Sequence, residues 1–218
     1  MSENNFQSTF ENGGFWDLYS DLERNFCNFL EYVPYLPGNE KTYSFKLLNL
    51  FNSIGGYIDS AFKEMARYSF QDSSETDLCQ DILERANNRQ GIFATSIDIF
   101  DTIYGIKIQK VKFKCLPDRE IIVPFSSECH DWWGVYNDVK HEVGFNLTKA
   151  NLKNVRDSLA GAFLLNAIHI PGAIRLRKYG VFKEKWQIPT WDFEDRIKRH
   201  EYAIGEVTTP IFVYDSDQ

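Results

Sequence analysis

The sequence lacks several signals that would place it in a familiar functional class. It has no apolar run near the roughly 18 residues that a membrane-spanning helix needs, so we expect no membrane protein. Its polar start has no basic segment followed by an apolar run, so we expect no secretory signal. A phosphate-binding glycine loop, a G-x-S-x-G elbow and an H-E-x-x-H motif are also missing, so the sequence gives none of the motif evidence that marks P-loop proteins, α/β-hydrolases or zinc metalloproteases.

Cysteine is scarce and scattered. The four cysteines are Cys27, Cys79, Cys115 and Cys129, and no C-x-x-C pair occurs. We therefore expect free thiols in a reducing cytoplasm. The segment Glu128-Cys-His-Asp131 groups possible metal ligands, but side chains at adjacent positions rarely converge on one ion, so we expect no metal site and no cofactor.

Positive charge is also in short supply. The chain has 24 Lys and Arg against 31 Asp and Glu, and its net charge of −7 gives no overall attraction for phosphate. Nucleic-acid binding would need a local basic patch. The most basic region holds Arg175, Arg177, Lys178 and residues 196–200, with Trp186 and Trp191 nearby. Those rings either stack on bases or pack this region onto the rest of the protein.

What the chain has in quantity is apolar and aromatic residues, at 43% and 16% of 218 residues, which is enough for one domain with additions. Residues 1–12 look like a flexible tail. Apolar residues three and four apart predict a helix over 15–33 and a second one after Ser44, a good N-cap. Gly55 and Gly56 inside the second helix indicate a kink or the close approach of another helix.

The later pattern predicts more helices and one hairpin. A third helix is expected over residues 77–88, and residues 92–104 fit either period, with helix favoured. Two strands around a turn are expected at about 106–124. A helix from about residue 128 should end at Gly144, and Thr148 should cap a long final helix.

These elements together predict a mainly α fold. We expect an up-and-down helical bundle over residues 13–170, with a small inserted antiparallel β-hairpin. Residues 171–218 should form a C-terminal appendage packed on the bundle, with a last strand over 210–214.

The richest polar cluster lies in WWGVYNDVKHEVGFNLTKANL, which starts at Trp132. On a helix, Trp133, Asn137 and His141 are four residues apart and share one face, and Lys140 lies beside Asn137 and His141. An amide, an ammonium and an imidazole in a row suit a phosphate or a carboxylate, and the histidine suits general acid–base chemistry. The alternative is structural, with His141 opposing the helix dipole and the other groups bonding to carbonyls of a neighbouring helix.

A second polar pair lies on the second helix. Asp59 and Lys63 are four residues apart and border its apolar stripe. They predict either a solvated ion pair or a contact with the motif helix, in which Asp59 pairs with Lys140 or His141.

The chain resembles the HEPN superfamily, a group of prokaryotic helical-bundle domains found in toxins, abortive-infection proteins and CRISPR-associated nucleases. The resemblance rests on the paired N-terminal helices, the hairpin ending in Ile121-Ile-Val-Pro-Phe125, the motif Trp133-x-x-Tyr-Asn-x-x-Lys-His141 and the helix after it. It covers about residues 15–170.

Catalytic HEPN ribonucleases carry R-x-x-x-x-H, with a polar residue often following the arginine. Asn137 and His141 match the polar residue and the histidine, but Tyr136 stands at the arginine position. No histidine of this chain has an arginine at the required spacing. A tyrosine supplies no cation for the charge that builds on phosphate, although Lys140 could substitute.

The resemblance therefore implies a non-catalytic domain that binds RNA or a protein partner in a stress or phage-defence setting. Asn137, Lys140 and His141 would contact the ligand, with Tyr136 and Trp133 beside them. Two alternatives stay open: a metal-independent ribonuclease using His141 and Lys140, and a purely structural domain whose motif clamps two helices. Since the family commonly dimerises across its motif, the resemblance also implies a homodimer.

Overall fold

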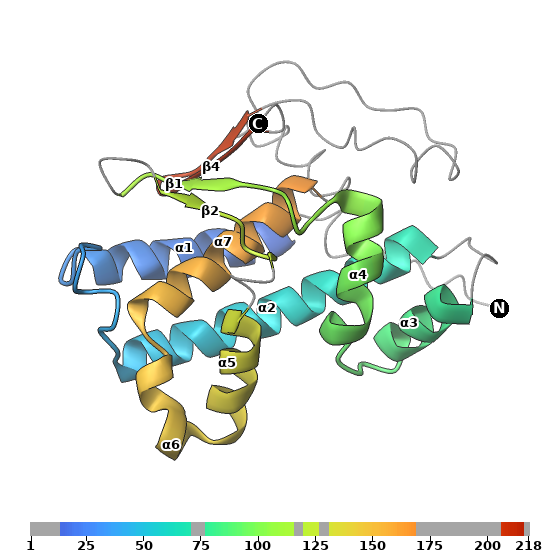
Figure 1. Ribbon diagram of the computed structural model, residues 1–218, viewed down its shortest axis with the longest axis horizontal. Helices are drawn as coiled ribbons and strands as arrows, with labels where there is room; N and C mark the ends of the chain where they lie inside the picture. The colour runs from blue at the N-terminus through green and yellow to red at the C-terminus, as the bar shows by residue number, and fades with distance from the viewer. Residues whose placement is uncertain (1–13, 71–76, 116–119, 127–130, 169–205, 216–218) are drawn as a thin grey trace.

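The computed structural model describes residues 14–70, 77–115, 120–126, 131–168 and 206–215, shown in colour in Figure 1. The expected tail, the segment 128–130 and the basic region 175–200 lie outside the described residues. In chain order the elements are α1 (Gly14–Leu30), α2 (Phe45–Phe70), α3 (Asp77–Asn87), α4 (Phe93–Tyr104), β1 (Val111–Phe113), β2 (Ile121–Ile122), α5 (Asp131–His141), α6 (Val143–Asn146), the 3₁₀ turn η1 (Leu147–Lys149), α7 (Leu152–Ile168), β3 (Glu206–Thr208) and β4 (Phe212–Asp215).

The centre of the fold is α7, which packs against α1, α2, α5 and β4. All of its residues from Val155 onward are buried, so it is apolar on every side and not amphipathic. The longest helix, α2, begins as expected, because the backbone N–H of Leu47 donates to Oγ of Ser44 at 3.1 Å. The apolar stripe of α2 is buried, which confirms the periodicity that predicted it.

The predicted hairpin forms, but it is part of a larger sheet. β1 pairs with β2 in antiparallel register, with Val111 opposite Ile122, and its other edge pairs with β4, with Val111 opposite Tyr214. The sheet order is β2-β1-β4-β3 (Figure 1). An isolated two-stranded hairpin leaves a free edge and is marginal in water, and strand β4 covers that edge. The predicted last strand is thus confirmed, inside the sheet.

Two predicted helix ends are wrong. Gly144 does not end the motif helix, because α5 stops at His141 and Gly144 lies within α6. The carbonyls at the end of α5 are instead capped by Asn146, whose Nδ2 donates to the carbonyls of Asp138 and Glu142 at 3.2 Å each. Nor does Thr148 cap α7.

The helix α7 is capped by Asn151 instead. Its Oδ1 accepts from the backbone N–H of Asn154 at 3.0 Å, which is the usual N-cap geometry.

Residues 92–104 do form a helix, as favoured. The described chain is therefore mainly α-helical with a small antiparallel sheet. Of the described cysteines, Cys27 and Cys115 are free thiols. None of the described helices has the length and apolarity that crossing a membrane requires.

Candidate functional site

The motif helix α5 lies on the outside of the bundle and contacts α2 and α7 (Figure 1). Its inner side is formed by Trp132, Tyr136 and Val139, which are all buried. The indole Nε1 of Trp132 donates to the carbonyl of Pro124 at 2.9 Å, so this ring also joins α5 to the end of the hairpin. One side of the motif is therefore structural.

Tyr136 enters a notch in α2 at Gly55. A Cβ on Gly55 would lie 2.2 Å from Cε2 of Tyr136, closer than any two carbon atoms can pack. The ring also meets Phe51 edge to face, with centroids 6.0 Å apart. Close approach of another helix, one of the two interpretations of the glycine pair, is thus confirmed at Gly55. Tyr136 is 5% exposed and serves packing.

Trp133 is half-buried and stacks on Phe93 in the first turn of α4, with centroids 4.1 Å apart and 19° between the planes. Its ring also contacts Tyr136 at 5.1 Å. One face of the indole is therefore covered by protein. Trp133 shares a helix face with Asn137 and His141, but its stacking on Phe93 leaves at most one face of the indole for a nucleic-acid base.

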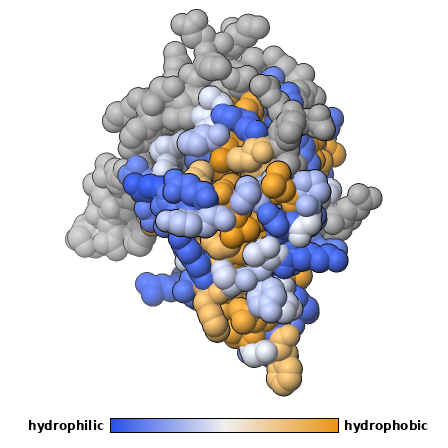
Figure 2. Space-filling model, turned by 90° about the vertical axis from the view of Figure 1, so that its left-hand side faces the viewer, coloured by the Kyte–Doolittle hydropathy of each residue, from blue (hydrophilic) through white to orange (hydrophobic). Residues whose placement is uncertain are grey.

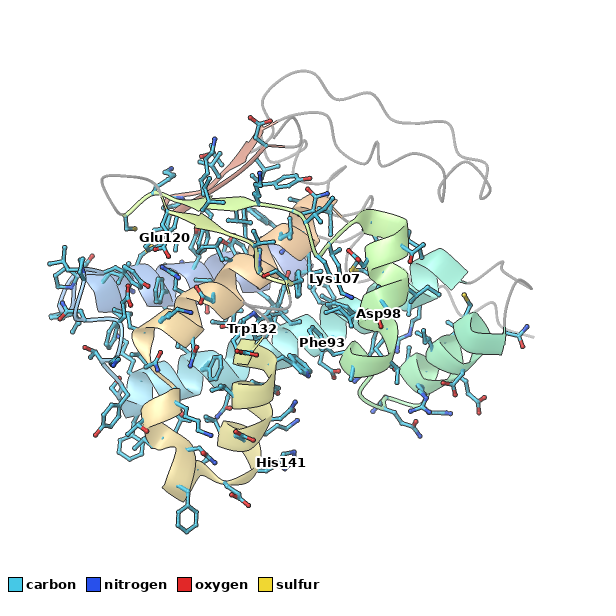
Figure 3. All side chains as sticks on the ribbon, viewed as in Figure 1. Phe93, Asp98, Lys107, Glu120, Trp132 and His141 are labelled. Atoms are coloured by element: carbon cyan, nitrogen blue, oxygen red, sulfur yellow. The ribbon has the colours of Figure 1, made fainter. Side chains whose placement is uncertain are left out.

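The polar side chains of the motif are accessible. Lys140 and His141 are exposed and Asn137 is half-buried. Within the described part of the chain, no hydrogen bond or ion pair involves these three side chains, and Lys140 Nζ lies 5.5 Å from the centroid of the Tyr136 ring. Figure 3 places His141 at the free end of α5, away from Trp132 and Phe93. The expected bonds from Asn137 and Lys140 to carbonyls of a neighbouring helix are therefore wrong for the described residues.

The pair Asp59 and Lys63 lies elsewhere. Lys63 Nζ is 2.5 Å from Oδ2 of Asp59 and 3.4 Å from the carbonyl oxygen of Arg89, in the loop after α3. The predicted contact of Asp59 with Lys140 or His141 is therefore wrong. The side chains of Asp59 and Lys63 are only 25% and 14% exposed, so the expected solvated pair is a largely covered one.

Sequence reasoning missed the apolar residues that follow the motif. Phe145 is 90% exposed and Val143 is 37% exposed, both on the short helix α6. Figure 2 shows apolar side chains gathering at the lowest tip of the molecule, the level at which α6 lies in Figure 1. We call Asp138, Lys140, His141, Glu142, Val143 and Phe145 the α5–α6 corner. The predicted helix runs as far as Gly144, so the sequence contains no sign that Val143 and Phe145 lie on a separate short helix outside the core.

Comparison with family models, with curated protein sequences and with solved structures gives no match to this chain. The resemblance to the HEPN superfamily therefore stays a prediction, and the candidate function depends on the geometry of the corner.

Proposed function

We propose that this chain is a non-catalytic protein-interaction module with a HEPN-like up-and-down bundle, and that it forms a homodimer through the α5–α6 corner. The observation that carries the proposal is the exposure of Phe145, at 90%, beside exposed charged groups. Aromatic residues are enriched in protein interfaces. Burial of an exposed phenyl ring by a partner lowers the free energy of the complex.

The charges of the corner favour a second copy as the partner. Glu142 is anionic and Lys140 is cationic, two residues apart at the end of α5, while Asp138 is already paired with Lys149 at 2.8 Å. In the pairing that we propose, Phe145 lies near the two-fold axis and Lys140 of each copy faces Glu142 of the other. Such a surface is self-complementary, as a two-fold interface requires.

Protein binding has more support than RNA chemistry. Tyr136 packs against Gly55 and supplies no cation to a substrate phosphate. Glu142 repels phosphate beside Lys140 and His141, in a chain of net charge −7. Phe93 already covers one face of Trp133, the nearest aromatic ring on which a base could stack.

Sedimentation velocity over a range of protein concentrations tests the pairing. We expect a dimer for the wild type and a monomer for Phe145→Ser. Lys140→Glu should weaken the dimer by roughly tenfold or more, and adding Glu142→Lys should restore it, because both partners of the exchanged pair then change sign. Ile108→Ser is the matched control, because Ile108 is 71% exposed outside the corner. A wild-type monomer at every concentration would refute the proposal.

The same preparations test the ribonuclease alternative. We expect no cleavage when the pure protein is incubated with transfer RNA and mixed RNA without metal ions. Cleavage by the wild type that disappears in His141→Ala would show that the corner is catalytic after all. Equal cleavage by both proteins would indicate a contaminating nuclease.

A further inference from the structure

A groove between α1, α2 and the loop after α3 has no role in the proposed pairing. Its volume is about 720 Å³, within the range of small-molecule sites. It is lined by Phe15, Leu18, Asp21, Leu22, Ser53, Gly56, Tyr57, Ser60, Lys63, Glu64, Arg67 and Arg89, which we call the α1–α2 groove. It shares no residue with the α5–α6 corner, so ligand binding in the groove does not depend on the homodimer.

Arg89 adopts a backbone conformation that arginine rarely takes. Its φ is 59°, in the left-handed region, and within the described residues it is the one non-glycine residue there. This conformation arises where α3 ends. The N–H of Gln90 donates to the carbonyl of Arg85 at 2.9 Å, and the N–H of Arg89 donates to the carbonyl of Ala86 at 3.2 Å. This is a Schellman motif, in which glycine is the usual residue at the position of Arg89.

The guanidinium of Arg89 has no described partner, unlike the other cations of the groove. Lys63 is paired with Asp59 at 2.5 Å, and Arg67 is paired with Glu64 at 2.6 Å. Arg67 also donates to the carbonyl of Ala86 at 2.7 Å, which fixes the end of α3 beside the groove. Among the described residues, Arg89 makes neither an ion pair nor a side-chain hydrogen bond, so the groove carries one uncompensated positive charge.

The rest of the groove offers apolar and aromatic surface. Phe15 and Tyr57 meet edge to face with centroids 5.4 Å apart, and Leu18 is 56% exposed. Gly56 contributes open space, because a Cβ there would meet no atom within 4 Å. Gly56 and Arg89 are both unfavourable for local backbone stability, and both line this groove. Residues that local stability disfavours are expected at functional positions.

We propose that the α1–α2 groove binds a small molecule with an apolar ring system and one anionic group. The rings lie against Phe15, Leu18 and Tyr57, over the space that Gly56 leaves open. The anionic group pairs with Arg89, which offers a fork of N–H donors that suits a carboxylate, a sulfonate or a phosphate.

A pair of dyes that share one ring system tests both parts of this site. Anilinonaphthalene sulfonate carries the anionic group, and phenylnaphthylamine has the same rings without it. We expect the sulfonate to bind the full chain at one site, and Arg89→Gly to weaken it by about tenfold or more while phenylnaphthylamine keeps its affinity within about twofold. Because glycine suits the backbone at this position, Arg89→Gly should raise the Tm by about 2–4 °C.

Matched variants separate the site from other dye-binding surfaces. Gly56→Leu should abolish binding of both dyes, because its side chain fills the groove. Arg85→Ala and Phe145→Ser should leave both affinities unchanged, since Arg85 is paired with Asp81 outside the groove and Phe145 lies on the corner.

Four results would overturn the proposal. The first is sulfonate binding that is equal in wild type and Arg89→Gly, and the second is dye binding that survives Gly56→Leu. The third is a lower Tm of Arg89→Gly with loss of both dyes, which would make Arg89 structural. The fourth is a change of sedimentation coefficient in Gly56→Leu, which would make the groove an interface between protein chains.

Discussion

The contact between Tyr136 and Gly55 can be tested by measuring protein stability, with the neighbouring Gly56 as the control position. Alanine at Gly55 puts a Cβ 2.2 Å from Cε2 of Tyr136, so the ring must retreat by about 1 Å into a close-packed interior. Overpacking of this kind costs about 1–3 kcal/mol. Alanine at Gly56 meets no atom within 4 Å. Both substitutions gain the same helix propensity, roughly 0.5–1 kcal/mol, so their difference isolates the overpacking.

Urea denaturation followed by circular dichroism measures that difference. We expect Gly56→Ala to be more stable than wild type and Gly55→Ala to be less stable than Gly56→Ala by about 1–3 kcal/mol. In a Tyr136→Val background the difference should close, because valine lacks the ring atoms that collide. Equal stability of the two alanine variants, or a difference that persists once Tyr136 has been replaced, would refute the account of α5 packing.

Three further measurements test other parts of the structure. Burial raises the pKa of Glu23 above its usual 4.5. The contribution of Glu23 to the free energy of unfolding is therefore complete below pH 4.5 and is lost as the pH rises through the raised pKa of the folded state. Urea denaturation at a series of pH values should show this decline in the wild type and not in Glu23→Gln. Asp157→Asn should cost about 1.5–3 kcal/mol, because Arg156 is 3% exposed and loses the more buried of its two carboxylate partners while Glu120 remains. Asp21→Asn, in an exposed pair, should stay within about 0.5 kcal/mol. His141→Ala should leave the Tm unchanged, and a sharp drop would favour the interhelical clamp.

Much of the helical part of this fold follows from the sequence, because its signals are local. The apolar residues of α1 and α2 recur every three or four positions, and Ser44 caps α2 as expected. The sheet is different. β1 pairs with β4 about a hundred positions later, and nothing in the strand of Phe212 indicates which edge it joins. Strand pairing depends on contacts distant in sequence, so the C-terminal strand was assigned to an appendage.

The site was predicted only in part, for a related reason. Helical spacing put Asn137, Lys140 and His141 on accessible positions, and they are exposed or half-buried. The same spacing put Trp133 beside them, but periodicity does not reveal that α4 supplies Phe93 as a stacking partner. The end of α5 was misplaced because Gly144 imitates a stop signal, while Asn146 caps the helix from beyond it.

The two glycines of α2 show why a sequence signal can be correct and still incomplete. Neighbouring helix residues point about 100° apart, so Gly55 and Gly56 serve different surfaces. Tyr136 explains Gly55, since its ring occupies the place of a side chain. No packed neighbour explains Gly56. The Schellman motif explains the left-handed backbone at position 89 but not why arginine occupies it, and both residues line the α1–α2 groove. Packing alone would select alanine and glycine there. If Gly56→Leu and Arg89→Gly remove binding while Arg89→Gly stabilises the fold, the groove was kept open at the expense of stability, which is the pattern expected of a binding site.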